Sequence, residues 1–171
     1  MRSALVVGIR FAVVLALAVS LAPAASAQTG TATGSIVYQS KAGLVTVRPK
    51  YAYLVKGPDT VTGNIVRRVV LSASDLAPKL RICATMMCGD GDMNEGLTID
   101  LDAGARINYW FVANGQRVQY SGTAEPSSLK LSSDTDQRVA GAWLLDARAA
   151  GGPRVQIEFD AALLKVFTKA H

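Results

Sequence analysis

Apolar residues beyond residue 33 recur mostly at every second position, which is the spacing of a β-strand with one buried face. Residues 97–102 read LTIDLD and residues 155–160 read VQIEFD, with strict alternation in both. Further strands are predicted at 34–40, 43–48, 50–56, 64–72, 129–132 and 162–167. The pattern therefore predicts a mainly β domain.

Two segments predict β-hairpins. In ARINYWFVANGQRVQYSG (105–122), Asn114-Gly115 can adopt the positive φ angles of a two-residue type I′ turn. The second hairpin, over 139–160, is expected to turn at Gly151-Gly152-Pro153. In the first hairpin we expect Ile107, Tyr109 and Phe111 on one face and Asn108, Trp110 and Val112 on the other.

One segment has helical periodicity instead. SDLAPKLRICATMMC (74–88) places its apolar residues on one face of a helix, with Ser74 as a possible N-cap and Pro78 in the first turn. We therefore expect an antiparallel sandwich or barrel-like sheet with one short helix, over about 74–86. A sheet of this kind must cover its apolar face, either by curling on itself or by using the helix as a plug.

The first 27 residues have the three parts of a secretory signal peptide. Arg2 and Arg10 precede an apolar run at 11–22, and Ala25-Ser26-Ala27 offers the small residues of a cleavage site. The apolar run is short for a membrane span, which needs about 20 residues. We therefore expect cleavage after residue 27, a single domain over 28–171 without a transmembrane segment, and a periplasmic or secreted protein.

Charge is segregated along the chain. Residues 41–81 carry eight Lys or Arg and two acids, whereas residues 90–102 carry five acids and no base. The bases alternate with apolar residues along the predicted strands, as on a solvated strand face. Proteins that bind nucleic acids instead gather their bases on one face. We therefore expect no nucleic-acid partner.

The two cysteines, Cys83 and Cys88, are five residues apart. A redox pair would have two intervening residues and lie near a βαβ unit, whereas an exported protein most simply uses two cysteines as a structural disulfide. Residues five apart on a continuous helix lie about 8–9 Å apart, beyond the ~7 Å limit for a bridge. The sequence therefore predicts a structural disulfide and a helix that ends before Cys88.

An acidic, Gly-rich stretch follows the second cysteine. Its first, third and fifth positions match a D-x-D-x-N calcium loop, but glycine comes one place late and the twelfth position is Leu101. A later carboxylate could substitute if the loop bulges. The candidate metal ligands are Asp90, Asp92, Asn94 and Asp102.

Bases elsewhere in the chain can neutralise these acids without a metal. We expect Arg67, Arg68 or Arg81 to do so, and therefore no tight calcium site and no other cofactor. The single histidine is His171, the last residue, so a catalytic triad or a zinc site would have to recruit the end of the chain. No pair of acids is singled out for catalysis, and an enzyme is the less favoured class.

Several stretches together resemble a group of proteins: KYAYLVKG (50–57), RVVLS (68–72), GLTIDLD (96–102), RVAGAW (138–143) and VQIEFDAAL (155–163). Their order is similar to that in small, uncharacterised, signal-peptide-bearing β-rich proteins exported by Gram-negative bacteria. The resemblance implies the same compartment and a β-rich fold. It implies no activity and no functional residues.

Two function classes fit these features. The first is an exported, non-catalytic binding module, such as an inhibitor or immunity-type protein, that docks on another protein in the cell envelope or outside the cell. The second is a small exported enzyme that acts on envelope polysaccharide through carboxylates or calcium. A cleft with two convergent acids would favour the enzyme, and a flat surface with a projecting 83–96 loop would favour docking.

Overall fold

The computed structural model describes residues 30–171, so the predicted signal peptide and its cleavage site lie outside the described residues. Within this range the chain forms ten strands, one α-helix and three short 3-10 helices. The strands are β1 (Gly30–Ser40), β2 (Gly43–Val47), β3 (Tyr51–Pro58), β4 (Ile65–Ser72), β5 (Gly96–Asp100), β6 (Ile107–Ala113), β7 (Val118–Ala124), β8 (Leu129–Asp134), β9 (Arg138–Asp146) and β10 (Arg154–Val166). The helices are α1 (Ala77–Ile82), η1 (Met86–Asp90), η2 (Pro126–Ser128) and η3 (Arg148–Ala150).

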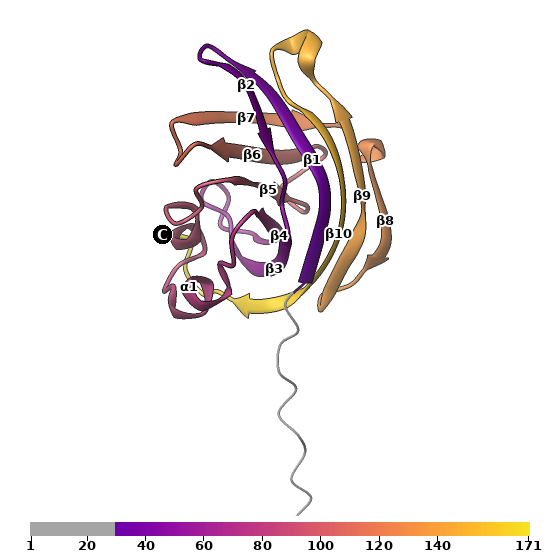
Figure 1. The fold of residues 1–171 in the computed structure, drawn as a ribbon. Coiled ribbons are helices and arrows are strands. Elements are labelled where there is room, and N and C mark those ends of the chain that lie inside the picture. Colours follow the sequence, from indigo (N-terminus) through magenta and orange to yellow (C-terminus); the bar gives the residue numbers. More distant parts are fainter. Residues whose placement is uncertain (1–29) are drawn as a thin grey trace, which may run out of the picture.

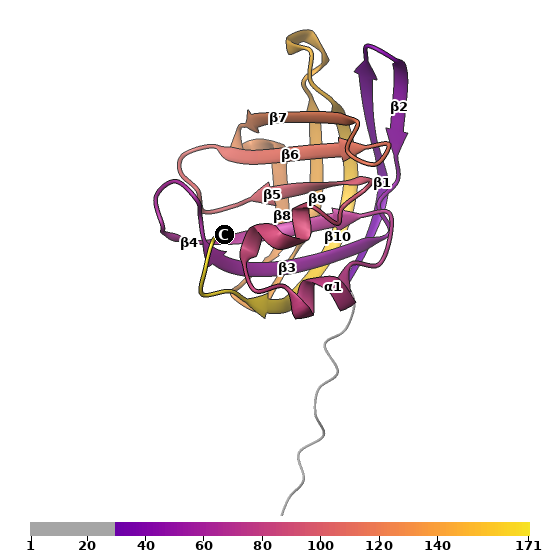
Figure 2. The same cartoon turned by 90° about the vertical axis from the view of Figure 1, so that its left-hand side faces the viewer.

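All ten strands belong to one strongly curved sheet (Figure 1). The strand order is β7-β6-β5-β4-β3-β1-β10-β9-β8, and β2 pairs with β1 as a side branch. Strands β3 to β7 form one layer, and β1, β10, β9 and β8 run across behind it (Figure 2). The pairings are antiparallel, except that the end of β10 lies parallel to β3. This half-barrel confirms the predicted antiparallel, barrel-like β fold with one short helix.

The main core fills the space between the two layers. It takes the inward-facing residues of both, including Leu54, Val69, Ile99 and Ile157. Trp143 of β9 is fully buried there, and its indole N–H donates to the hydroxyl of Ser128 at 3.0 Å. The curved sheet therefore covers its own apolar face and needs no helix inside.

Helix α1 lies over the outer face of the first layer (Figure 2), and a second apolar cluster fills the space between that face and the α1–η1 segment. Strand residues Tyr53, Val66 and Val70 meet Leu80 and Met86 from the helical segment. The C-terminal tail also joins this cluster, because the carbonyls of residues 169 and 170 accept hydrogen bonds from the N–H groups of residues 86 and 87. The helix thus covers the outside of the sheet and does not plug one end.

Several predicted strand boundaries differ from the observed ones by a few residues, and three elements differ more clearly. The helix is shorter than 74–86, and Asp75 rather than Ser74 accepts the hydrogen bond from the N–H of Ala77. The Asn114-Gly115 hairpin forms with the predicted faces, but its loop has four residues, since pairing resumes only at Val118. The segment 162–167 is not a separate strand, because residues 162–166 continue β10. Among residues 30–171, no helix has the length and apolar character needed to cross a membrane.

Candidate functional site

A pocket of about 320 Å³ opens on the outer face of β4, β5 and β6, beside η1. Residues at alternate positions of these strands point outward and pair across them, as Arg68, Asp100 and Asn108 do in one row. The 3-10 helix η1 forms the remaining wall. The pocket is lined by Arg68, Met87, Asp90, Thr98, Asp100, Asn108, Tyr109 and Trp110.

A buried arginine organises the charges of this pocket. The Nε and Nη2 groups of Arg68 donate to the two oxygens of Asp100 at 2.6 and 2.9 Å. Its Nη1 group donates to Asp90 at 3.2 Å and contacts the sulfur of Met87 at 3.1 Å. The side chains of these three charged residues are only 10–18% exposed. Two carboxylates therefore converge on one guanidinium in a largely dehydrated place.

The two carboxylates are not equally held. Asp100 receives two hydrogen bonds from Arg68, whereas Asp90 receives one longer bond. Burial, with a smaller contribution from the neighbouring charge of Asp100, raises the pKa of Asp90 from 3.8 to about 6, although Arg68 opposes the shift. Asp90 is thus a carboxylate whose ionised form is incompletely compensated.

The disulfide and the packing of η1 hold Asp90 over the strands. Cys83 and Cys88 are bonded, with Cα atoms 5.6 Å apart, and α1 ends at Ile82 as the bridge requires. Both predictions about the cysteines are therefore confirmed. Gly89 lies directly against the side chain of Leu80, where a Cβ atom would come within 2.4 Å of it. Segment 83–96 accordingly packs on the sheet and does not project from it.

The loop after β6 supports the same wall from the other side. The side-chain amide of Gln116 donates to the carbonyls of Asp90 and Gly91 at 2.8 and 3.0 Å. Both Asn114 and Gln116 have positive φ angles, a conformation that non-glycine residues rarely adopt. The lengthened turn therefore places an amide where it fixes the backbone that carries Asp90.

The four candidate metal ligands do not come together. Asp90 pairs with Arg68, Asp92 pairs with Lys79 at 2.5 Å, and Asp102 pairs with Arg67 at 2.8 Å. The backbone carbonyl of Asn94 accepts a bond from Gly115. Among residues 30–171, no group of three or more Asp, Glu, His or Cys side chains is placed to hold a metal ion. Of the three bases expected to neutralise these acids, Arg67 and Arg68 do so, and Lys79 takes the place of Arg81.

The expected pairing of Arg68 with the acids is present, but its burial differs from the expectation. The bases of 41–81 are predicted on solvated strand faces, whereas Arg68 is 8% exposed and lies on the same face as the buried Val66 and Val70. The signal was present in IVRRVVLS (65–72), where an arginine occupies a position whose neighbours at i−2 and i+2 are both apolar. A charge in such a row needs a buried partner, and Asp100 supplies it from the adjacent strand.

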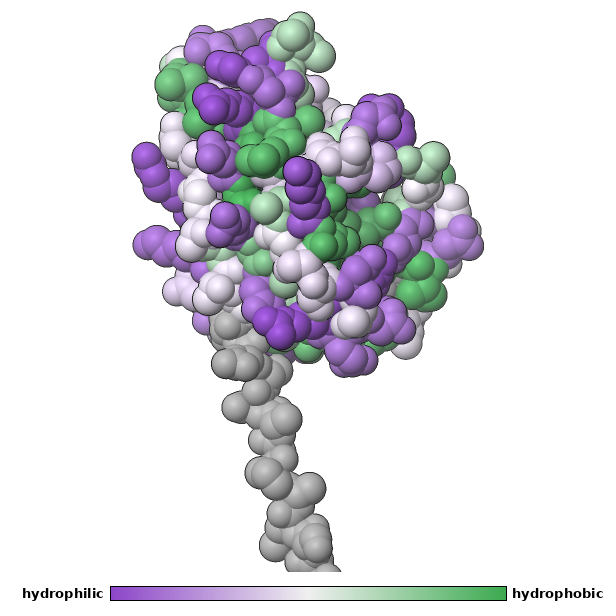
Figure 3. Space-filling model, turned by 90° about the vertical axis from the view of Figure 1, so that its right-hand side faces the viewer, coloured by the Kyte–Doolittle hydropathy of each residue, from purple (hydrophilic) through white to green (hydrophobic). Residues whose placement is uncertain are grey.

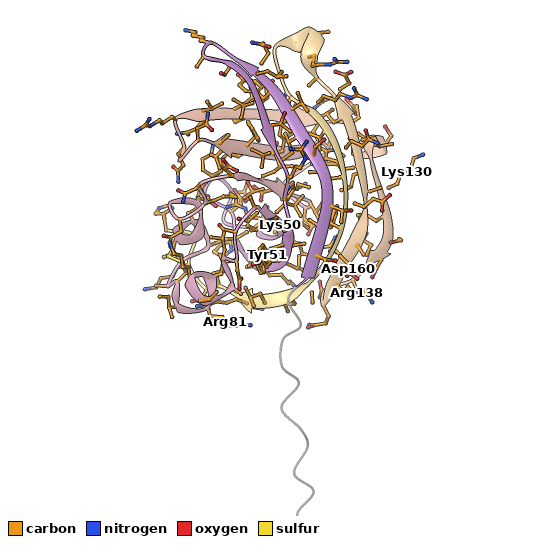
Figure 4. The ribbon with its side chains drawn as sticks, viewed as in Figure 1. Lys50, Tyr51, Arg81, Lys130, Arg138 and Asp160 are labelled. Carbon is orange, nitrogen blue, oxygen red and sulfur yellow. A yellow bond between two sulfur atoms is a disulfide. The ribbon has the colours of Figure 1, made fainter. Side chains whose placement is uncertain are left out.

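Two other hollows differ in character. One, of about 340 Å³, lies where the open edge of β8 approaches the first layer, and Arg67 spans it by binding both Asp102 and Asp134. The other, of about 420 Å³, lies over β8, β9 and β10 and is more open to solvent. That face mixes hydrophilic and hydrophobic residues (Figure 3), and Arg138 and Asp160 lie together on it, with Lys130 directed to solvent (Figure 4). Arg138 and Asp160 bind each other.

The first of these hollows, the Arg68 pocket, combines aromatic and thioether walls with buried charge. Pockets of this kind, with a few convergent polar groups and a perturbed pKa, are typical of binding or catalytic sites. No protein-family model, curated protein or solved structure matches this chain.

Proposed function

We propose that this protein is an exported, non-catalytic binding module that docks on another protein through the Arg68 pocket. The observation that carries the proposal is the pocket beside Trp110, whose side chain is only partly buried. Tryptophan side chains at the edge of a pocket are frequent anchors of protein interfaces. The disulfide and the Gln116 bonds hold the pocket wall in place, which lowers the entropy lost on docking.

The arrangement of acids favours binding over catalysis. Both carboxylates in the pocket are bonded to the same guanidinium, so Arg68 occupies the space between them where a substrate would have to react. A glycoside hydrolase instead keeps its two carboxylates apart on either side of the scissile bond. A projecting 83–96 loop would also have favoured docking, but this segment packs on the sheet and gives no such support.

The test is capture of a partner by residues 28–171 with the pocket open or filled. Asn108→Trp places a large side chain at the exposed rim of the pocket, and Thr46→Trp places the same side chain at an exposed position of β2, a strand that contributes nothing to the pocket. We expect immobilised wild-type protein and Thr46→Trp to retain the same envelope protein, and Asn108→Trp to lose it. Equal retention by all three would refute docking through this pocket.

A second candidate function has one specific observation in its favour. Asp90, with a raised pKa of about 6, lies beside Asp100, and a protonated acid near an ionised one is the arrangement used in glycoside hydrolysis. Purified protein would then release soluble sugars from envelope polysaccharide, and Asp90→Asn would abolish the release. Absence of any release by the wild-type protein would eliminate this candidate.

A further inference from the structure

We propose that the group received by the Arg68 pocket is the ammonium group of a lysine side chain on the partner protein. This inference rests on the proposed function and specifies its chemistry. It follows from the charge of the pocket, its free hydrogen-bonding groups and the apolar surfaces around them.

The charges that line the pocket sum to minus one. Arg68 contributes one positive charge, and Asp90 and Asp100 contribute two negative charges. The nearby pair of Asp92 and Lys79 cancels itself at 2.5 Å. A net negative charge in a place where water is largely excluded attracts a cation more strongly than the same charge on an open surface. A single cationic group would neutralise the pocket.

The hydrogen-bonding groups of the pocket point to the same ligand. The Nε, Nη1 and Nη2 groups of Arg68 are each engaged with Asp90 or Asp100, so the guanidinium has little left to offer an anion. Among the described residues, no donor reaches the Oδ1 atom of Asp90. An ammonium group carries three donors and no acceptor. The charged cluster therefore has an acceptor to spare on Asp90, which can receive a further donor.

The apolar walls suit the stem of a lysine. Met87 and Trp110 flank the charged cluster, one from η1 and one from β6. A lysine side chain can lay its methylene groups along such surfaces while its charged end reaches a polar group. An ammonium group near an indole ring also gains from the negative face of the ring. At about 320 Å³ the pocket is at the small end of ligand sites, which fits one long side chain.

The experiment is an NMR titration of residues 28–171 with the blocked peptide Ac-Gly-Ser-Lys-Ser-Gly-NH₂. The indole N–H signal of Trp110 reports on the pocket, and that of Trp143, buried in the main core, serves as an internal reference. The norleucine peptide is the matched control, because it keeps the stem and removes the charge. We expect the lysine peptide to bind at least about tenfold more tightly than the norleucine peptide, the size of one charge-assisted hydrogen bond.

Variants then assign the effect to Asp90. Asp90→Asn should abolish the preference for lysine, whereas Asp92→Asn, which removes an exposed acid two residues away, should keep it. Equal binding of the lysine and norleucine peptides, or no response of Trp110 to the lysine peptide, would overturn the inference. The Asn108→Trp capture experiment tests docking separately, so a negative peptide titration would refute the lysine assignment and not docking itself. If n-butylammonium alone bound as tightly as the peptide, the ligand would be a free amine and the assignment to a partner protein would be wrong.

Discussion

Replacing Asp90 by asparagine should make the protein more stable at neutral pH. The pKa of this carboxyl is raised from 3.8 to about 6 in the folded state. One pKa unit corresponds to about 1.4 kcal/mol, so keeping Asp90 ionised in the folded protein costs about 3 kcal/mol relative to the unfolded chain. Asparagine cannot ionise, and its side-chain oxygen can still accept the bond from Arg68.

The sign of the pH dependence follows from proton binding. Between pH 3.8 and about 6 the folded state holds the Asp90 proton more tightly than the unfolded chain does. The contribution of Asp90 to the free energy of unfolding therefore decreases as pH rises through this window and stays lower above it. Relative to the wild type, Asp90→Asn should be more stable by about 1–3 kcal/mol at pH 7.5, and the difference should nearly disappear at pH 4.

Urea denaturation at pH 4, 5, 6 and 7.5, followed by tryptophan fluorescence, measures this difference. Asp92→Asn is the matched control, because its exposed ion pair with Lys79 should contribute no more than about 1 kcal/mol. A variant that is no more stable than the wild type at pH 7.5 would refute the reasoning, as would a difference that does not change between pH 4 and pH 7.5. If Asp90→Asn both stabilises the protein and abolishes lysine binding, then Asp90 lowers the stability of the fold but is needed for binding.

Three further predictions concern the disulfide, calcium and the main core. Thiol titration of the denatured, unreduced protein should find no free cysteine, and two free thiols would contradict the bond between Cys83 and Cys88. Thermal melts in EDTA and in excess calcium should nearly coincide, because Asp90, Asp92 and Asp102 are each paired with a base; a calcium-dependent rise in Tm that Asp92→Ala abolishes would contradict this. Trp143→Ala should lower the free energy of unfolding by about 3–5 kcal/mol in urea denaturation, and a loss below about 1 kcal/mol would show that the core tolerates the cavity.

The strands and their faces could be predicted because alternation is a local property. The hairpin over 105–122 placed Ile107, Tyr109 and Phe111 in the main core, with Trp110 and Val112 on the outer face, as the period of two requires. The helix break before Cys88 could also be predicted, because bridge geometry excludes a continuous helix. Each of these inferences depends only on residues near one another in the sequence.

The pocket could not be predicted in the same way. It requires Arg68 and Asp100 to be register partners on adjacent strands, and Asp90 to be laid over both by a helical segment. The register of β4 and β5 is set by the long connection through α1 and η1, which has no simple turn rule. The sequence identifies Arg68 as a base able to neutralise the acids, and its apolar neighbours at i−2 and i+2 indicate a buried position, but which acids it meets there follows only from the strand register.

The last strand has a consequence for how the molecule can assemble. A ribosome makes β10 after all the other strands, yet β10 joins β1 and β9 by antiparallel pairing and then runs beside β3. Until β10 emerges, β1 and β9 each lack a neighbour, and the two layers are linked mainly through the short contact between β1 and β3. The pairing of β10 with β1 is slow to form, because the long segment between these two strands must close as a loop before they meet. The half-barrel should therefore close only after the whole of β10 has been made.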